Sequence, residues 1–348
     1  MACGGPAAVS SQLSSPVKDR LMSLQDNVKI VTTQLTSGSS TRQHGSVFSR
    51  AKYWSDLVSR ANLVSDWCTK LAVFFSKPPA PKLEECGPVI HGIENSILAL
   101  VSVYYSLPPA EGTTLNKEVQ KSVIDILNGV ETLSTIIITN GCNCESDCLK
   151  ETGGVWNSCE RISQLSKDNK AATLRIFINN LQLLRDACSE LEEVTTGDGM
   201  DELELALGDG PCNDDDDVTG GSCDLTDDDK LLIQSCTRLV KCCPEGVANI
   251  SRSITKYGDV TTSDGIEQLD AAATIVMTIS PCVDNVVTSL YPPINQPVVM
   301  QSVAELKDKM LVLVEKCRNF EFCKAAHFLN LDDMKKEILD SFESISKH

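Results

Sequence analysis

The sequence has 348 residues, of which 42% are apolar and 23% are charged, and its formal net charge is −17. A chain of this length and apolar content has room for one large or two ordinary domains with buried cores. The acidic balance and the lack of any Lys/Arg cluster argue against direct binding of nucleic acid, because phosphate contacts require a basic surface.

The first half of the chain is expected to be helical. Ser15 and Pro16 provide a cap and a first-turn proline, and apolar residues then recur at steps of three and four. This stripe consists of Val17, Leu21, Leu24, Val28 and Val31. Residues 36–49, rich in Ser, Thr and Gly, are expected to form a loop. The same helical period predicts further helices over residues 50–75, 89–106, 117–139 and 155–165.

The most regular apolar pattern follows Asp168, which is a suitable helix cap. Six residues recur at alternating steps of three and four, with no Gly or Pro between them: Leu174, Phe177, Leu181, Leu184, Cys188 and Leu191. Such a stripe is either a zipper face that pairs with another chain or the core face of one helix in a bundle. Its short length and the cysteine in the seam favour the bundle.

An acidic segment separates this helix from the rest of the chain. Residues 197–229 include thirteen acidic side chains and no basic one. Like charges with little apolar surface cannot offset the entropy of ordering, so we expect a solvated linker. The predicted organisation is a flexible N-terminus (1–14), an N-terminal helical bundle (15–195), an acidic disordered linker (196–227) and a C-terminal helical bundle (228–348).

Helical patterns resume after the linker. A stripe that begins at Leu232 meets Pro244, where the lost backbone donor predicts a kink or a break. Pro281 likewise predicts a kinked or restarted helix. No segment of any length alternates with a period of two. We therefore predict an all-α fold of two bundles with about five helices each.

Neither secretion nor a membrane span is expected. The first residues show no charged segment followed by an apolar core. The longest apolar stretch, residues 97–107, ends at Pro108 and is too short to cross a bilayer. The sixteen cysteines, several of them at apolar helical positions, are therefore expected to be reduced thiols.

Candidate metal and catalytic sites are weak. Cys142, Cys144, Cys148 and Cys159 could supply four thiolates to zinc, but their spacing lacks paired C-x2-C knuckles, which favours ordinary loop thiols. No nucleophile-elbow, metalloprotease or nucleotide-binding motif occurs. We therefore expect no catalytic residue, no metal and no cofactor.

Thr226 is the candidate phosphorylation site. A calcium loop that begins at Asp215 would need a bidentate Glu at its twelfth position, which is Thr226, so the acidic run does not match a calcium loop. Thr226 is followed by three aspartates, Asp227, Asp228 and Asp229. This pattern resembles the acceptor site of an acidophilic kinase, and it predicts a phosphorylated threonine.

Several short segments, in a fixed order along nearly the whole chain, carry a family resemblance. The most specific are Asp168-Asn169-Lys170-Ala171-Ala172, Ser280-Pro281-Cys282-Val283-Asp284 and Ser289-Leu290-Tyr291-Pro292-Pro293. Others are Val73-Phe74-Phe75-Ser76, Val103-Tyr104-Tyr105-Ser106-Leu107-Pro108 and Val155-Trp156. Together they resemble the cyclin-D-binding protein family, also called the Grap- and cyclin-D-interacting proteins.

The resemblance implies an all-helical protein of nucleus and cytoplasm that binds D-type cyclins and restrains cell-cycle progression. It also implies adaptor or helix-loop-helix partners and inhibition of transcription without DNA binding. We expect a non-enzymatic regulator that sequesters partners through helical surfaces. The alternative from another class is a helical-bundle scaffold or adaptor similar to vinculin and talin. The oligomeric state is not predicted.

Overall fold

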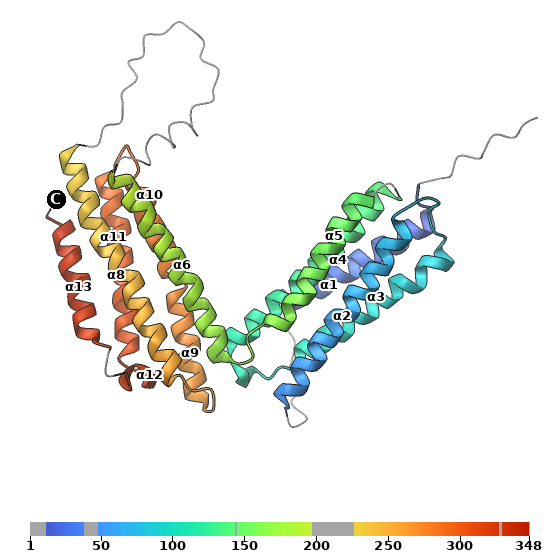
Figure 1. The fold of residues 1–348 in the computed structure, drawn as a ribbon, viewed down its shortest axis with the longest axis horizontal. Coiled ribbons are helices and arrows are strands. Elements are labelled where there is room, and N and C mark those ends of the chain that lie inside the picture. The colour runs from blue at the N-terminus through green and yellow to red at the C-terminus, as the bar shows by residue number, and fades with distance from the viewer. Residues whose placement is uncertain (1–11, 38–47, 143–144, 197–225, 327–328, 348) are drawn as a thin grey trace, which may run out of the picture. The chain divides into compact units, whose positions relative to one another are not determined.

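The computed structural model describes residues 12–37, 48–142, 145–196, 226–326 and 329–347. The chain forms two compact units that divide between Lys167 and Asp168. Within the described ranges every regular element is a helix, which confirms the predicted all-α fold (Figure 1).

Unit 1 (residues 1–167) is built from long helices that lie side by side (Figure 1). They are α1 (Ser15–Ser37), α2 (Arg50–Phe75), α3 (Leu83–Tyr105), α4 (Thr113–Asn140) and α5 (Glu145–Arg161). Two 3-10 turns, η1 (Pro109–Glu111) and η2 (Ile162–Gln164), adjoin them. Helix α2 packs on α3 and α5, while α4 packs on α1 and α5. The first predicted stripe is buried from Val17 to Val28, whereas Val31 is partly exposed.

Three helices of unit 1 begin earlier than predicted. Helices α3, α4 and α5 start at residues 83, 113 and 145, whereas the apolar period placed their starts at 89, 117 and 155. The first turns of α3 and α4 mix polar residues with apolar ones, among them the buried Cys86 and Leu115, and the prediction placed each start further inside the helix. For α3 one bond marks the true start, because the Lys82 backbone N–H donates to Glu85 Oε2 over 2.8 Å. Pro88 is accommodated inside the helix.

Unit 2 (residues 168–348) contains seven helices in its described part. They are α6 (Asn169–Thr196), α8 (Asp227–Tyr257), α9 (Ser263–Val276), α10 (Ile279–Ser289), α11 (Gln296–Cys317), α12 (Glu321–Lys324) and α13 (Leu331–Ile345). This exceeds the expected five or so, since α6 joins the unit and the four-residue α12 was not anticipated. One apolar cluster connects these helices and includes the fully buried Phe177, Ile250 and Leu313.

The assignment of α6 to unit 2 corrects the predicted N-terminal bundle of residues 15–195. Helix α6 packs along α8 and also contacts α9 and α10. Asn169 Nδ2 donates to Asp270 Oδ1 over 2.9 Å, and the Thr173 hydroxyl lies 3.5 Å from the Leu269 carbonyl. The prediction placed the boundary at the charge run. The boundary in fact follows the helix that supplies apolar surface to the second core.

The predicted linker (196–227) and the predicted flexible N-terminus (1–14) fall largely outside the described residues. Residues 197–225 and 1–11 are in this category. At the described edges of the linker, Thr196 ends α6 and Asp227 begins α8.

The two prolines of unit 2 at which a kink or a break is predicted, Pro244 and Pro281, have different effects. Helix α8 runs from Asp227 to Tyr257 without a break at Pro244. Pro244 cannot donate to the Val240 carbonyl four residues earlier, and the Cys188 Sγ of α6 lies 3.9 Å from that carbonyl oxygen. Near Pro281 the helix restarts, as predicted, because α9 ends at Val276 and α10 begins at Ile279.

Candidate functional site

The predicted stripe on α6 lies in the core of unit 2. Its members Phe177, Leu184 and Leu191 are fully buried, and Leu181 is 9% exposed. Leu174 packs partly buried against the same cluster. The stripe therefore packs inside the bundle of unit 2. It is not exposed as an apolar face of α6 that could pair with a second chain. The outward apolar residues of α6, Ile178 and Leu183, are five positions apart and so lie on different faces.

Thr226 is the N-cap of α8 rather than part of a loop that precedes it. Its hydroxyl accepts from the Asp229 backbone N–H over 3.1 Å, while Asp229 Oδ2 accepts from the Thr226 backbone N–H over 3.0 Å. This reciprocal pair is a capping box. Asp227, Asp228 and Asp229 occupy the first turn, where carboxylates stabilise the helix through its dipole.

The cysteine cluster differs from the expected set of reduced loop thiols. Cys148 is buried and disulfide-bonded, so the expectation was wrong for this residue. Cys142 and Cys159 are buried free thiols. Burial raises the pKa of Cys159 to about 12. Cys144 lies outside the described residues. In the described ranges no group of three or more His, Cys, Asp or Glu is placed to hold a metal ion.

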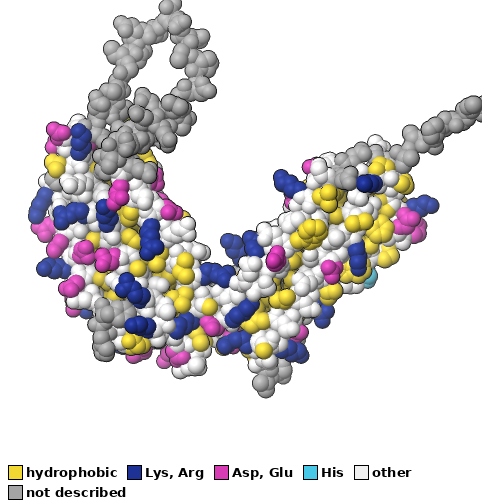
Figure 2. Space-filling model, in the orientation of Figure 1, with side chains coloured by type: hydrophobic (Ala, Val, Ile, Leu, Met, Phe, Trp, Pro, Cys, Tyr) yellow, Lys and Arg dark blue, Asp and Glu magenta, His cyan; other side chains and the backbone are white. Residues whose placement is uncertain are grey.

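An apolar groove runs between α1 and α3 in unit 1. We call it the α1–α3 groove, and its volume is about 340 Å³. Its lining residues are Leu24, Asn27, Val28, Ile30, Val31, His91, Glu94, Asn95, Ile97 and Leu98. Leu24, Val28 and Ile97 form a buried floor, whereas Ile30 and Leu98 are 55% and 57% exposed. Figure 2 shows that such exposed apolar side chains occur on the helices of unit 1 among charged ones.

One end of the α1–α3 groove is fixed by an ion pair. Arg20 Nη1 donates to Glu94 Oε1 over 2.8 Å, and a second bond joins Arg20 Nη2 to Glu94 Oε2. Asn27 Nδ2 also donates to Glu94 Oε1, over 3.1 Å. The hydrogen bond from Arg20 lowers the pKa of Glu94. The pair ties α1 to α3 at this end and holds the groove walls at a fixed separation.

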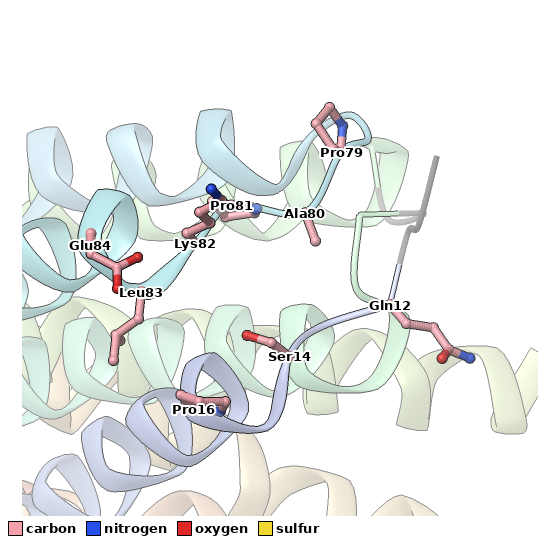
Figure 3. A pocket seen from close by; sticks show the side chains of 9 residues that line it. All are labelled: Gln12, Ser14, Pro16, Pro79, Ala80, Pro81, Lys82, Leu83 and Glu84. Atoms are coloured by element: carbon pink, nitrogen blue, oxygen red, sulfur yellow. The ribbon is translucent and has the colours of Figure 1, made fainter. Parts of the chain in front are cut away.

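A second pocket lies where the α2–α3 connection faces the start of α1. Its volume is about 460 Å³, and Figure 3 shows the segment from Pro79 to Leu83 opposite Ser14 and Pro16, with open space between them. Gln12 and Glu84 complete the lining. The walls are mainly proline rings and aliphatic stems, and no titratable groups converge on one point.

Unit 2 has a charged crevice between α8 and α13, with a volume of about 560 Å³. Three bases and three acids line it together with Cys242 and Ser341: Arg238, Lys241, Lys336, Asp333, Glu337 and Asp340. Lys241 is already paired with Glu192 over 2.6 Å. The mixed charges select no single ligand chemistry.

Three helical segments are long and apolar enough to cross a membrane by length and composition. They are Leu83–Tyr105, Thr113–Asn140 and Ser263–Ser289. The expectation that no segment reaches this length was therefore too strict. Between 39% and 50% of each apolar window is buried inside its own unit. The apolar character of these segments is thus used in large part by bundle packing.

Periodicity identified the floor of the α1–α3 groove but missed its edges. Leu24 and Val28 belong to the predicted stripe, whereas Ile30 lies off it and Leu98 was not singled out. The signal that could have found them is an apolar residue just outside the core stripe of two neighbouring helices. The neighbour relation is not visible in the sequence.

Comparison with known proteins places the chain in a family. The family models "Grap2 and cyclin-D-interacting", N-terminal and C-terminal, match residues 56–197 and 212–315. Cyclin-D1-binding protein 1 homolog of Danio rerio is 32% identical over 88% of each chain. The Xenopus laevis homolog is 30% identical over 88% of this chain and 91% of its own. Cyclin-D1-binding protein 1 of Homo sapiens is 29% identical over 92% and 89%. This chain therefore belongs to the family of Grap2 and cyclin-D-interacting proteins.

Proposed function

We propose that this chain binds a D-type cyclin and restrains cell-cycle progression by sequestering it. The observation that carries the proposal is the similarity to cyclin-D1-binding proteins, which extends through both units. The family is one of cyclin-binding proteins and not a known enzyme family.

Sequestration requires a surface that competes for a partner and performs no chemistry on it. Two helical units with buried cores provide rigid helix faces, and helix-in-groove recognition uses such faces. Among the described residues, the α1–α3 groove combines a hollow with exposed apolar edges. Such a surface supports binding through burial of apolar area, with polar groups that set orientation.

The test measures binding between the purified full chain and a purified D-type cyclin by isothermal titration calorimetry. The expected result is saturable binding with a Kd of about 1 μM or tighter, equivalent to roughly −8 kcal/mol. A cyclin of another class serves as the control and should bind at least tenfold more weakly. Equal binding of both cyclins, or no heat with either, would contradict the proposal.

Further properties implied by the family remain part of this proposal. They are adaptor or helix-loop-helix partners, inhibition of transcription and residence in both nucleus and cytoplasm. The net charge of −17 supports an indirect effect on transcription, because direct binding to DNA would need a basic surface. Fractionation and imaging of the full chain in cells, with a transcription reporter, would test these points. Exclusion from the nucleus would contradict the transcriptional part.

Phosphorylation of Thr226 is proposed as a regulatory modification. Thr226 is exposed and precedes three aspartates, and its backbone is extended. A phosphoryl group on Oγ1 would remove the hydroxyl proton now donated to Asp229 Oδ2 and would add charge beside the carboxylates of the first turn. Mass spectrometry of cellular protein should detect the phosphopeptide. An unmodified Thr226 at high peptide coverage would contradict this.

A further inference from the structure

We propose that the α1–α3 groove is the docking site for an amphipathic helix of the partner, and that basic residues border the apolar face of this helix. The inference rests on the proposed function only for the identity of the partner as a D-type cyclin. The groove itself, its apolar edges and its charge are properties of unit 1.

The apolar residues at the two edges of the groove are largely exposed to solvent. Ile30 and Leu98 lie on different helices, are more than half exposed and flank one hollow with a buried floor. Removal of their remaining apolar surface from water would favour binding. Two such residues on facing edges provide the apolar anchors that a partner helix needs.

The dimensions of the groove suit a helix. Its lining covers residues 24–31 of α1 and 91–98 of α3, about two turns or 10 Å along each helix. A helix that lies in such a groove presents residues at i, i+3, i+4 and i+7 to its floor. The ion pair between Arg20 and Glu94 bounds one end of the groove and keeps α1 and α3 in register.

The charges around the groove determine which charged residues are favoured beside the apolar face of the partner helix. Helix α3 carries Glu84, Glu85 and Glu94 and has no Lys or Arg between its first and last residue. No Lys or Arg lines the groove in the described part of the chain. On α1, the exposed Asp26 precedes Ile30 by one turn.

Nearby bases do not cancel this negative rim. Arg20 is already bound to Glu94, and Lys29 is paired with Glu131 of α4 over 3.6 Å. Asp26 therefore remains as the rim charge, since Glu84 lines the other pocket of unit 1, and Asp26 favours Lys or Arg on the incoming helix. A partner helix with an acidic border would meet like charges and bind more weakly.

The test uses the full chain and a model peptide. The peptide is an amphipathic helix of about 14 residues, roughly four turns, with leucines on one face and lysines on both borders. A second peptide keeps the leucines and replaces the lysines by glutamates. Binding is measured by fluorescence polarisation to wild type, Ile30→Glu, Leu98→Glu and Val73→Glu. Val73 is 68% exposed, lies on α2 outside the groove lining and is the matched control.

We expect the lysine-bordered peptide to bind wild type and Val73→Glu equally, and to bind both groove variants roughly tenfold or more weakly. The glutamate-bordered peptide should bind wild type more weakly than its counterpart. Equal binding of the lysine-bordered peptide to all four proteins, or no saturable binding, would overturn the groove assignment. Equal affinity of the two peptides would overturn the charge preference. Far-UV circular dichroism should show the same helix content for all four proteins.

A D-type cyclin then serves as competitor and separates this inference from the proposed function. Displacement of the peptide by cyclin, with loss of cyclin binding in Leu98→Glu, supports both. Cyclin that binds all variants equally and does not displace the peptide overturns the groove as its site and leaves the proposed function intact. Peptide binding without any cyclin binding supports the groove and overturns the proposed function.

Discussion

Single residues decide how closely helices approach in unit 1. An added Cβ on Gly92 of α3 would lie 2.6 Å from two carbons of the Trp67 ring on α2. At Gly153 of α5, an added Cβ would meet no atom within 4 Å. Both glycines are helical, so the same substitution should have opposite effects. At Gly92 the absence of a Cβ leaves room for the Trp67 ring, whereas Gly153 has no such packing role.

Substitution of Gly92 by alanine should destabilise unit 1 by about 1–3 kcal/mol, because the Trp67 ring must shift in a packed interface. Substitution of Gly153 by alanine should stabilise the unit by about 0.5–1 kcal/mol through the lower backbone entropy of the unfolded chain. Urea unfolding followed by tryptophan fluorescence reports on unit 1 alone, because Trp54, Trp67 and Trp156 all lie there. Effects of the same sign at both positions would contradict the packing account.

The Arg20–Glu94 pair gives unit 1 a pH-dependent contribution to stability. The pKa of Glu94 is lowered in the folded state, mainly by the hydrogen bond from Arg20. The pair therefore stabilises the fold fully above the unfolded glutamate pKa of about 4.3. This stabilisation is lost as the pH falls through the lower folded value.

We expect Glu94→Gln to lower the unfolding free energy by about 1–2 kcal/mol at pH 7, and the difference from wild type to shrink as the pH drops below about 4. Urea titrations with tryptophan fluorescence at several pH values measure it. Glu160→Gln is the control, since the Glu160 side chain is exposed on α5, and it should match wild type throughout. A difference for Glu94→Gln that persists unchanged at pH 3 would rule out the ionic contribution.

At the scale of elements, the sequence predicts helices better than it predicts their neighbours. The three-and-four period follows directly from burial of one face, so most residues of the stripes on α1 and α6 are found in the cores. The period does not state which core a helix enters. The predicted boundary at residue 195 therefore left α6 in the wrong unit. The edges of the α1–α3 groove were missed for the same reason, because two exposed residues form a surface only when their helices are neighbours.

The assignment of α6 predicts which fragments fold. A fragment of residues 168–348 keeps the contacts of Phe177 and Leu184 with the second core and should melt cooperatively. A fragment of residues 228–348 lacks α6, exposes the apolar surface of α8 that α6 covers and also loses the Thr226 cap. It should lose the cooperative transition. Circular dichroism melts of both fragments measure this, and equal cooperativity would show that α6 is not part of the second unit.

The whole molecule combines two folded units with an uneven distribution of charge. Unit 1 is balanced, with fifteen Lys/Arg and fifteen Asp/Glu in residues 1–167. Residues 197–225 contain ten acidic side chains and no basic one. Much of the net charge of −17 thus belongs to the connection between α6 and α8, two helices that pack on each other. These residues therefore join two helices that are neighbours within unit 2.

Replacement of residues 197–225 by a neutral Gly/Ser linker of about eight residues should leave both units folded. The change makes the net charge less negative, from −17 to −7. Each halving of a flexible loop reduces its closure entropy cost by about 0.6 kcal/mol, so unit 2 should gain roughly 1 kcal/mol. Far-UV circular dichroism during urea unfolding measures both units, and tryptophan fluorescence measures unit 1, whose transition should not move. A large loss of helix content in the variant would show that the acidic segment contributes to folding. Unchanged helix content with a higher midpoint for unit 2 would identify it as a solvated connection whose charge is available for interactions with partners.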